Sequence, residues 1–426
     1  MLSKKSLSLN LLLFLSFILY LLFMALLKTD YRFRLYFLIT LFQFGIYFYL
    51  LWQIFRHQEK LPSFTRLLIF TGLYRLIFIC SIPVLMNPFS DITRQPVEIG
   101  SLYFINVPAW MLPYYIKWPV GSIFFWLFLM LFAESIVGFL LYKMIRHFSI
   151  SVYRLFIVLL NPLWIIEIYL HGHPQIIGIL GLWLAIYLFY LKKDWLALPA
   201  VIFSFLISFV PLLTYMPFLY KKFWSKIFLV LSGIVLIILF CSAVEMISSY
   251  YFIFIPDRGI FNGVLISVGL GLLKFINFSG QEIISVYWFG NPVIIYTRNE
   301  FYILLLIVFI VLAVIVTQIN KLRMTAQYRG INYLQTGYII TASLLLVSPV
   351  LNPWQLLWIL PFMIYIPNWS WLIFTVLIQL SYLVSMKYLL SDNINTSVWI
   401  LLIQYIPFYI LLIVEYLDKR RIKGWF

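Results

Sequence analysis

Residues 174–191 read PQIIGILGLWLAIYLFYL and contain no charged side chain, and Lys192 and Lys193 follow them directly. An α-helix needs about 20 mainly apolar residues to cross the hydrocarbon core of a bilayer. Apolar runs of this length, bounded by basic residues, are typical of membrane-spanning helices. This run therefore indicates an integral membrane protein, and other parts of the chain repeat its pattern.

The 426-residue chain is 64% hydrophobic and 10% charged, whereas soluble domains are about 25% charged. This composition excludes a water-soluble domain and a disordered chain. We predict an all-α fold, a polytopic transmembrane protein of about 12–14 helices. The predicted spans lie near residues 8–27, 33–55, 66–86, 119–142, 150–170, 174–191, 224–246, 301–319, 333–350, 354–367, 370–390 and 396–417.

The segment 196–220 is too short for two full crossings, although lysines flank it at both ends. Pro211 and Pro217 interrupt its apolar pattern, and proline inside a helix removes a main-chain hydrogen bond. We therefore predict a hairpin of two short helices with its tip near Phe209–Pro211.

The net charge of +16 comes from 30 basic and 14 acidic residues. The basic residues lie mostly in short loops between apolar runs, as in membrane proteins whose cytoplasmic loops are rich in lysine and arginine. We therefore interpret the positive charge as a signal of membrane topology and predict no nucleic-acid partner. With the N-terminus in the cytoplasm, most basic residues fall on the cytoplasmic side. The loops 88–118 and 247–300 and the turns 171–175 and 348–354 then fall on the opposite face.

The loop 88–118 contains two acidic residues and an arginine, Asp91, Arg94 and Glu98, just beyond a predicted helix end. A solvated loop is one interpretation of these residues. The other is a functional site, in which a carboxylate acts as general acid or base beside a guanidinium clamp. Lys117 follows among aromatic residues, an arrangement that suits an interfacial anchor or the lip of a sugar or phosphate site.

Residues 161–175 read NPLWIIEIYLHGHPQ. Glu167 and His171 are four positions apart and share one helix face, and His173 and Gln175 follow beyond a glycine. An intramembrane acid beside two histidines favours a functional site over a structural one. A zinc site is disfavoured because no third ligand stands at usable spacing, and we predict no metal.

Residues 348–361 read SPVLNPWQLLWILP, in which two prolines around Asn352 predict a tight turn. Trp354 and Trp358 lie one helical turn apart. An aromatic belt at a membrane edge is the simplest interpretation of these tryptophans.

These motifs, in this order, resemble those of the C-type (GT-C) integral-membrane glycosyltransferases that use polyprenyl-phosphate sugars. The first matched pattern is D-x-x-R-x-x-x-(D/E), at Asp91, Arg94 and Glu98, and the pairs Pro113-Tyr114 and Trp118-Pro119 follow it. The next patterns are N-P-L-x-x-x-E, at Asn161 to Glu167, and G-H-x-Q, which includes His173 and Gln175. The last is P-x-x-(H/N)-P-W, at Pro349, Asn352, Pro353 and Trp354, with Trp358 and Pro361 after it. The chain departs from the family at Gln175, where aspartate is frequent, at Asn352 and Gln355, where histidine and tyrosine are frequent, and around Ser208, which replaces a lysine.

The resemblance implies a catalytic core over residues 66–367, two additional N-terminal helices within 1–65, and C-terminal helices with a basic cytoplasmic tail in 368–426. It implies transfer of a hexose, with mannose favoured, from a polyprenyl-phosphate donor to a lipid or glycan acceptor at the outer face of a prokaryotic cell membrane. No cofactor is implied, and the sequence does not support a divalent metal.

The resemblance also assigns roles to individual residues. Asp91 would be the catalytic base and Glu98 its helper. The residues expected to bind the substrates are Arg94, Lys117, His171, His173, Gln175, Asn352 and Trp354.

Two other functions fit a polytopic membrane protein: a lipid-linked saccharide flippase or transporter, and an enzyme resembling O-antigen polymerases. Transporters often contain paired inverted repeats with matching broken helices. The sequence shows no convincing repeat, and its polar motifs gather on one predicted face. The ordered motifs favour the glycosyltransferase over both alternatives.

The acid pattern of the loop 88–118 yields a first prediction. Asp91→Asn should lower turnover by about 10²–10⁴-fold while donor binding is largely kept, because it removes a general base without changing its shape. Glu98→Gln should cost less and act mainly on apparent affinity. Sugar transfer and donor binding by purified variants measure both effects, and near-normal transfer by Asp91→Asn would move the assignment to Glu98.

Overall fold

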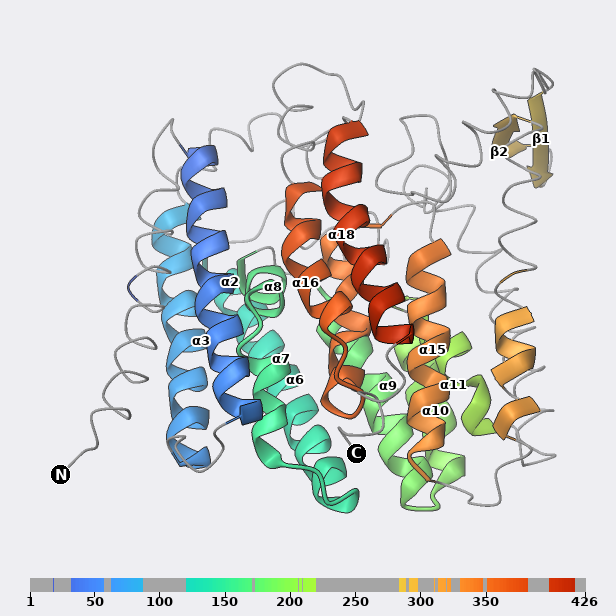
Figure 1. Ribbon diagram of the computed structural model, residues 1–426, viewed down its shortest axis with the longest axis horizontal. Helices are drawn as coiled ribbons and strands as arrows, with labels where there is room; N and C mark the ends of the chain where they lie inside the picture. Colours follow the sequence, from blue (N-terminus) through green and yellow to red (C-terminus); the bar gives the residue numbers. More distant parts are fainter. Residues whose placement is uncertain are drawn as a thin grey trace.

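A computed structural model shows a helical bundle (Figure 1). The residues that the structure describes are 18, 32–56, 63–86, 120–170, 173–205, 207–208, 210–219, 283–288, 291–297, 310, 313–318, 320–322, 330–347, 351–381 and 398–417. The predicted loop 88–118 and the predicted span 224–246 lie outside these residues, as do all but one residue of the span 8–27 and most of the span 301–319.

Long helices form most of the described structure, as the apolar runs predicted. They are α2 (Arg32–Arg56), α3 (Phe64–Met86), α6 (Val120–His147), α9 (Gln175–Tyr190), α10 (Asp194–Phe205), α11 (Val210–Leu219), α15 (Asn332–Val347), α16 (Trp369–Leu377) and α18 (Val398–Leu417). Short turns connect some of them: η3 (Val152–Leu155), α7 (Phe156–Leu159), α8 (Pro162–Ile165), η4 (Ile166–Leu170), η6 (Pro353–Trp358), η7 (Leu360–Ile364) and η8 (Ile378–Leu380).

Two helical stretches of the described residues, Phe125–His147 and Ile400–Leu417, are long and apolar enough to cross a membrane. A bent pair, Val152–Leu159 with Pro162–Tyr169, raises this to three if it is counted as one span. These helices are compatible with a membrane protein, and the larger number of crossings stays a prediction.

A small β-hairpin accompanies the helices and was not predicted. Strand β1 (Ile283–Trp288) pairs antiparallel with β2 (Asn291–Thr297), with an irregularity between Val286 and Tyr287. The hairpin lies within the predicted loop 247–300. Its sequence is rich in β-branched and aromatic residues, which favour strands. The predicted all-α class therefore holds for the helical bundle but does not include this hairpin.

The two predicted short helices are confirmed as α10 and α11, but the predicted tip at Phe209–Pro211 lies too far along the chain, because α11 already begins at Val210 and includes Pro211. α10 packs closely on α9, because Gly181 leaves no side chain between them. A Cβ atom at Gly181 would lie 2.8 Å from the Ala200 carbonyl oxygen and 2.8 Å from Ser204 Cβ. The Ser204 hydroxyl also donates a hydrogen bond to the Gly178 carbonyl oxygen, which ties the two helices together.

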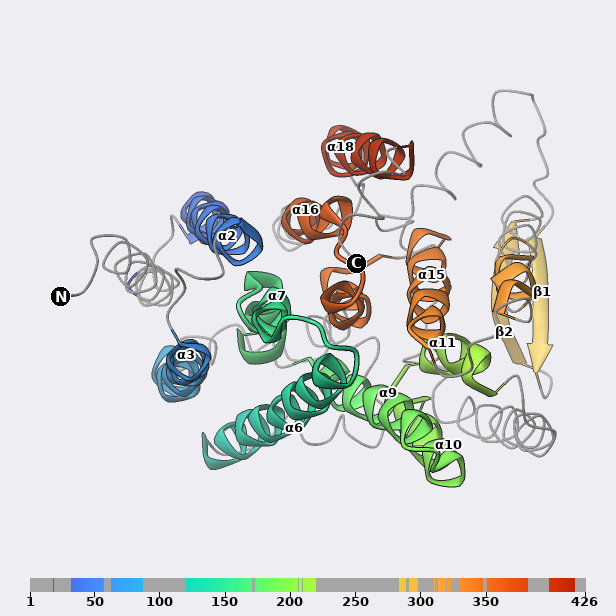
Figure 2. The same ribbon diagram turned by 60° about the horizontal axis from the view of Figure 1, so that its bottom comes forward.

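Two predicted spans are wrong in their internal structure. Residues 354–367 form the successive 3₁₀ turns η6 and η7 instead of a helix, and almost all of them are buried. Residues 150–170 bend by 57° between α7 and α8. Asn161-Pro162 lie at the bend in the second segment and Asn352-Pro353 directly precede the first, and proline cannot supply the main-chain donor that a continuous helix requires. Figure 2 shows the long helices arranged around these central turns.

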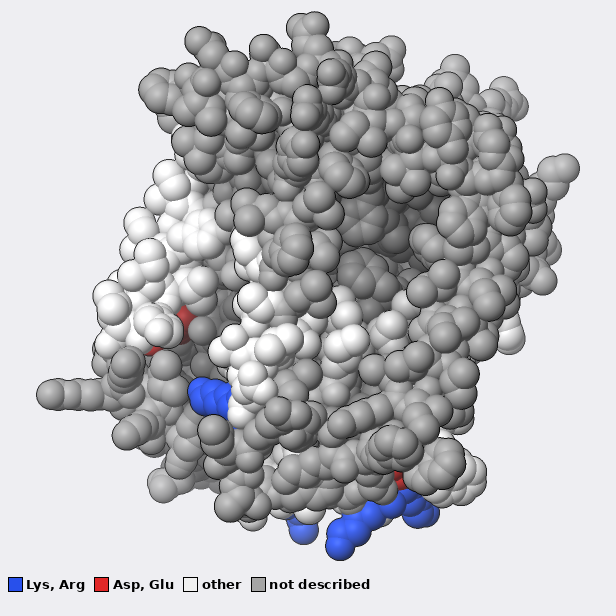
Figure 3. Space-filling view, turned by 90° about the vertical axis from the view of Figure 1, so that its right-hand side faces the viewer, with Lys and Arg blue, Asp and Glu red and all other residues white. Residues whose placement is uncertain are grey.

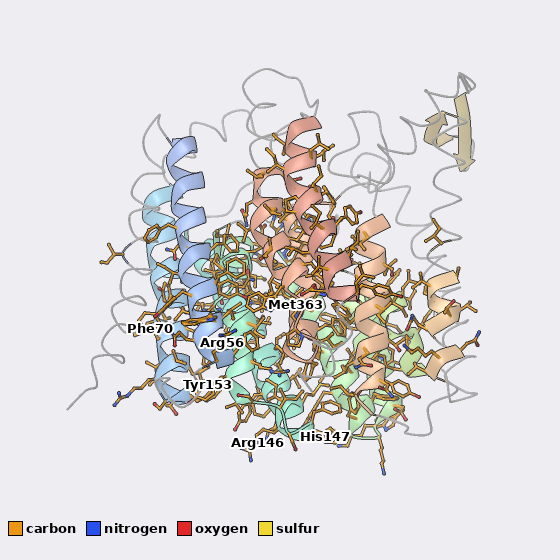
Figure 4. All side chains as sticks on the ribbon, viewed as in Figure 1. Arg56, Phe70, Arg146, His147, Tyr153 and Met363 are labelled. Carbon is orange, nitrogen blue, oxygen red and sulfur yellow. The ribbon has the colours of Figure 1, made fainter. Side chains whose placement is uncertain are left out.

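The ends of α6 and α9 lie together at one end of the bundle. His147 and Phe148 contact the Tyr190 ring, at centroid distances of 5.8 and 5.1 Å. The exposed residues Arg146, Lys192 and Lys193 are adjacent in sequence to these contacts. Figure 4 places Arg146 and His147 at the lower end of the view. On the face in Figure 3, described basic side chains gather at the lower edge, and one further basic group lies higher, at the left. The cytoplasmic location of these basic residues stays a prediction.

The α9–α10 contact gives a stability prediction. Gly181→Ala should lower the free energy of unfolding by about 1–3 kcal/mol, because the added methyl group forces two helix backbones apart. Gly138→Ala is the matched control, since nothing lies within 4 Å of a Cβ at that position of α6. It should stabilise the protein by up to about 1 kcal/mol, because alanine has the higher helix propensity. Thermal denaturation in detergent compares the two variants.

Candidate functional site

The candidate site begins where the helix after α6 is interrupted. Asn161 forms the N-cap of α8, and its Oδ1 accepts a hydrogen bond from the Leu163 amide at 2.9 Å. Its Nδ2 donates to the Tyr47 hydroxyl oxygen at 3.2 Å, and this hydroxyl donates to the Ile157 carbonyl oxygen at 2.5 Å. Asparagine is a preferred N-cap and proline a preferred first helical residue. The sequence thus dictates the interruption locally, and α2 holds it in place.

Glu167 lies just after this break, in the π-helical turn η4. π-Turns are rare and are frequent at functional sites. The His173 amide donates to the Glu167 carbonyl oxygen at 3.0 Å, so the chain folds back across the turn. His173 Nε2 lies 3.6 Å from Glu167 Oε2, and the two residues are 4% and 0% exposed. A buried imidazole is therefore close to a buried carboxylate; the sequence paired Glu167 with His171, which lies outside the described residues.

The imidazole of His173 stacks on the indole of Trp354, with ring centroids 4.2 Å apart and an interplanar angle of 28°. Trp354 belongs to η6, and Asn352 precedes that turn. The Asn352 amide donates to Gln355 Oε1 at 2.8 Å, one half of a capping box. Two motifs that are about 180 residues apart in the chain therefore meet face to face.

Gln175 begins α9 beside this contact and is 2% exposed. Among the residues that the structure describes, neither its Oε1 nor Trp354 Nε1 has a hydrogen-bond partner. Buried polar atoms are nearly always paired in proteins, so each exception calls for an explanation. One acceptor and one donor are thus available to a bound polar molecule in this part of the chain.

The turns η6 and η7 run along α9 in the same direction. Trp354 contacts His173 at the start of α9, and a Cβ at Gly178 would lie 2.6 Å from Trp358 Cη2. Tyr365, just after η7, stacks on Trp183 at 5.7 Å. The His173–Trp354 contact therefore lies at the opposite end of α9 from the basic residues that follow Tyr190.

The structure describes four of the nine residues predicted for the site. His173 and Trp354 are in contact, and Gln175 and Asn352 are their near neighbours in sequence. The other five, Asp91, Arg94, Glu98, Lys117 and His171, lie outside the described residues.

Sequence analysis missed a second buried polar cluster, in which Arg75 pairs with Glu134. A charged residue inside each of two apolar runs was the available signal.

Among the described residues no group of three His, Cys, Asp or Glu side chains could hold a metal ion. Comparison of the chain with models of protein families, with curated proteins and with solved structures finds no match.

The stacking of His173 on Trp354 yields a prediction about stability. His173→Ala should lower the free energy of unfolding by about 1–3 kcal/mol, because it removes a buried partner of both Glu167 and Trp354. A double-mutant cycle with Trp354→Phe should give a coupling energy of about 0.5–3 kcal/mol. Exposed His147 supplies the control, since His147→Ala should change stability by less than about 0.5 kcal/mol. Equal effects of the two alanine variants would contradict the contact.

Proposed function

We propose that the protein is a membrane glycosyltransferase of the GT-C type, which moves a hexose from a polyprenyl-phosphate donor to a lipid or glycan acceptor. The observation that supports it is the contact between His173 and Trp354. Each residue belongs to one of the motifs that resemble the family, and the fold brings them together beside buried Glu167. Mannose is the hexose we favour, and the outer face of a prokaryotic cell membrane is the proposed location.

The proposed reaction is a substitution at the anomeric carbon. The acceptor hydroxyl oxygen forms the new bond, the bond to the phosphate oxygen breaks, and Asp91 takes the hydroxyl proton. Glu98 assists Asp91. The departing phosphate ester develops negative charge, which fixed cationic and donor groups stabilise, and Arg94, Lys117 and His171 have this role.

The described residues bind the sugar in this proposal. Aromatic rings such as those of Trp354 and His173 offer apolar faces with a polar edge. Gln175 Oε1 and Trp354 Nε1, which have no partner among the described residues, offer an acceptor and a donor for sugar hydroxyls. Asn352 shapes the turn that carries Trp354. Bound substrate would then satisfy polar atoms that are buried without it.

Gln175→Met separates binding from folding. The change replaces an amide whose oxygen is unpaired in the described structure. Burying a polar atom without a hydrogen bond costs free energy, so an apolar side chain of similar shape should not destabilise the fold. We expect unchanged or higher thermal stability and an increase of about tenfold or more in KM for the donor, since a lost hydrogen bond costs about 1–3 kcal/mol. Transfer of radiolabelled sugar from a polyprenyl-phosphate donor in proteoliposomes provides the measurement.

Gln404→Met is the matched control. Gln404 is buried in α18, and its Oε1 likewise has no partner in the described part of the chain, while its Nε2 donates to Ser381 Oγ at 3.2 Å. This variant should leave KM unchanged. Equal KM values for the parent and Gln175→Met would remove Gln175 from the binding site. Movement of the lipid-linked sugar across the bilayer without transfer to acceptor would favour a transporter.

A further inference from the structure

α3 and α6 share a buried ion pair. Arg75 Nε donates to Glu134 Oε2 at 2.9 Å and Arg75 Nη2 to Glu134 Oε1 at 2.6 Å, and each residue is 3% exposed. Removing two charges from water is costly, and exchanging such a pair for apolar residues is often neutral or stabilising. Stability alone therefore does not account for this pair, and its other contacts show what it holds.

The pair contacts both arms of the bent helix. Before the break, Arg75 Nη2 donates to the Leu159 carbonyl oxygen at 2.7 Å. After the break, Glu134 Oε1 accepts from Trp164 Nε1 at 2.7 Å, and Glu134 Oε2 accepts from the Tyr169 hydroxyl. The guanidinium also lies over the Tyr169 ring, 5.9 Å from its centroid. One ion pair thus fixes three points around the interruption.

The spacing of two of these points favours the π-turn. Trp164 and Tyr169 are five positions apart, which in an ordinary α-helix separates them by about 140° around the axis. A π-turn contains one more residue per hydrogen-bonded turn, so it brings positions five apart closer to one face. A single carboxylate that accepts from both side chains therefore favours the register of η4, the turn that carries Glu167.

We infer that Arg75 and Glu134 are positioning residues, which hold the π-turn so that Glu167 lies against His173. The pair acts on the turn through Trp164 and Tyr169, whose side chains donate to Glu134. Its effect on sugar transfer rests on the proposed function, whereas its effect on the geometry of the site does not.

The test uses the full-length protein in detergent and the reactivity of two histidines. His173 is buried and His147 is exposed, so diethyl pyrocarbonate should modify His147 quickly and His173 slowly in the parent. In Arg75→Met/Glu134→Leu the break loses its donor and its acceptor while no charge is left unpaired. We expect a melting temperature close to that of the parent and a rise of about tenfold or more in His173 modification relative to His147, because local opening becomes easier. Mass spectrometry of peptides gives both rates.

A second variant removes the side chains of the bent helix that bond the ion pair. Trp164→Phe/Tyr169→Phe keeps the ion pair and removes the two donors to Glu134, so it should also expose His173, even if the first variant fails to fold. Thr341→Val is the control for loss of a buried polar contact elsewhere, because Thr341 bonds Thr214 at 2.8 Å between α15 and α11. It should leave His173 protected.

Transfer kinetics add a measurement that a purely stabilising role would not change. If the pair positions the site, turnover by the folded variants falls while KM for the donor changes little. Protection of His173 at the parental level in both double variants would overturn the inference, whatever the transfer rate. Exposure of His173 in a protein whose parent shows no transfer would support the positioning role and reject the proposed function.

Discussion

The helix break between Leu159 and Asn161 imposes the constraint on which the site depends. A break frees main-chain donors and acceptors, and in an apolar bundle each must find a partner within the protein. Asn161 Oδ1 caps the Leu163 amide, and Arg75 Nη2 takes the Leu159 carbonyl oxygen. Burying a guanidinium then requires a buried carboxylate, which Glu134 supplies. The local choice of Asn-Pro thus leads to an ion pair between two other helices.

The same constraint acts on the second Asn-Pro segment, with a different result. There the chain forms successive 3₁₀ turns along α9, which place Trp354, Trp358 and Tyr365 in a row. Close packing of this row requires small residues opposite, and Gly178 provides one of them, since a Cβ there would overlap Trp358. A substrate site at Trp354 would therefore stand on a rigid base of packed aromatic residues, and rigid support improves the precision of a binding site.

Sequence patterns predicted the long helices well because helix formation in an apolar chain depends on local composition and on proline position. α6 and α9 lie close to their predicted bounds, and α10 and α11 together occupy the segment predicted as a hairpin at 196–220. The segments 354–367 and 150–170 were predicted as continuous because hydrophobicity alone does not distinguish a buried 3₁₀ turn from a helix. The β-hairpin within 247–300 was missed for a related reason: its strand-forming residues are short runs in a chain that is apolar throughout.

Local sequence patterns were sufficient for the apolar helical class, the turn at Asn352-Pro353 and the resemblance of ordered motifs to one family of membrane transferases. They also placed His173 and Trp354 among the candidate residues. Tertiary packing is what stacks these two rings, places Glu167 beside His173, and pairs Arg75 with Glu134 around the break. The physical reason is that capping and helix propensity act within a few neighbouring residues, whereas partners for buried charges and rings come from whichever helices pack together.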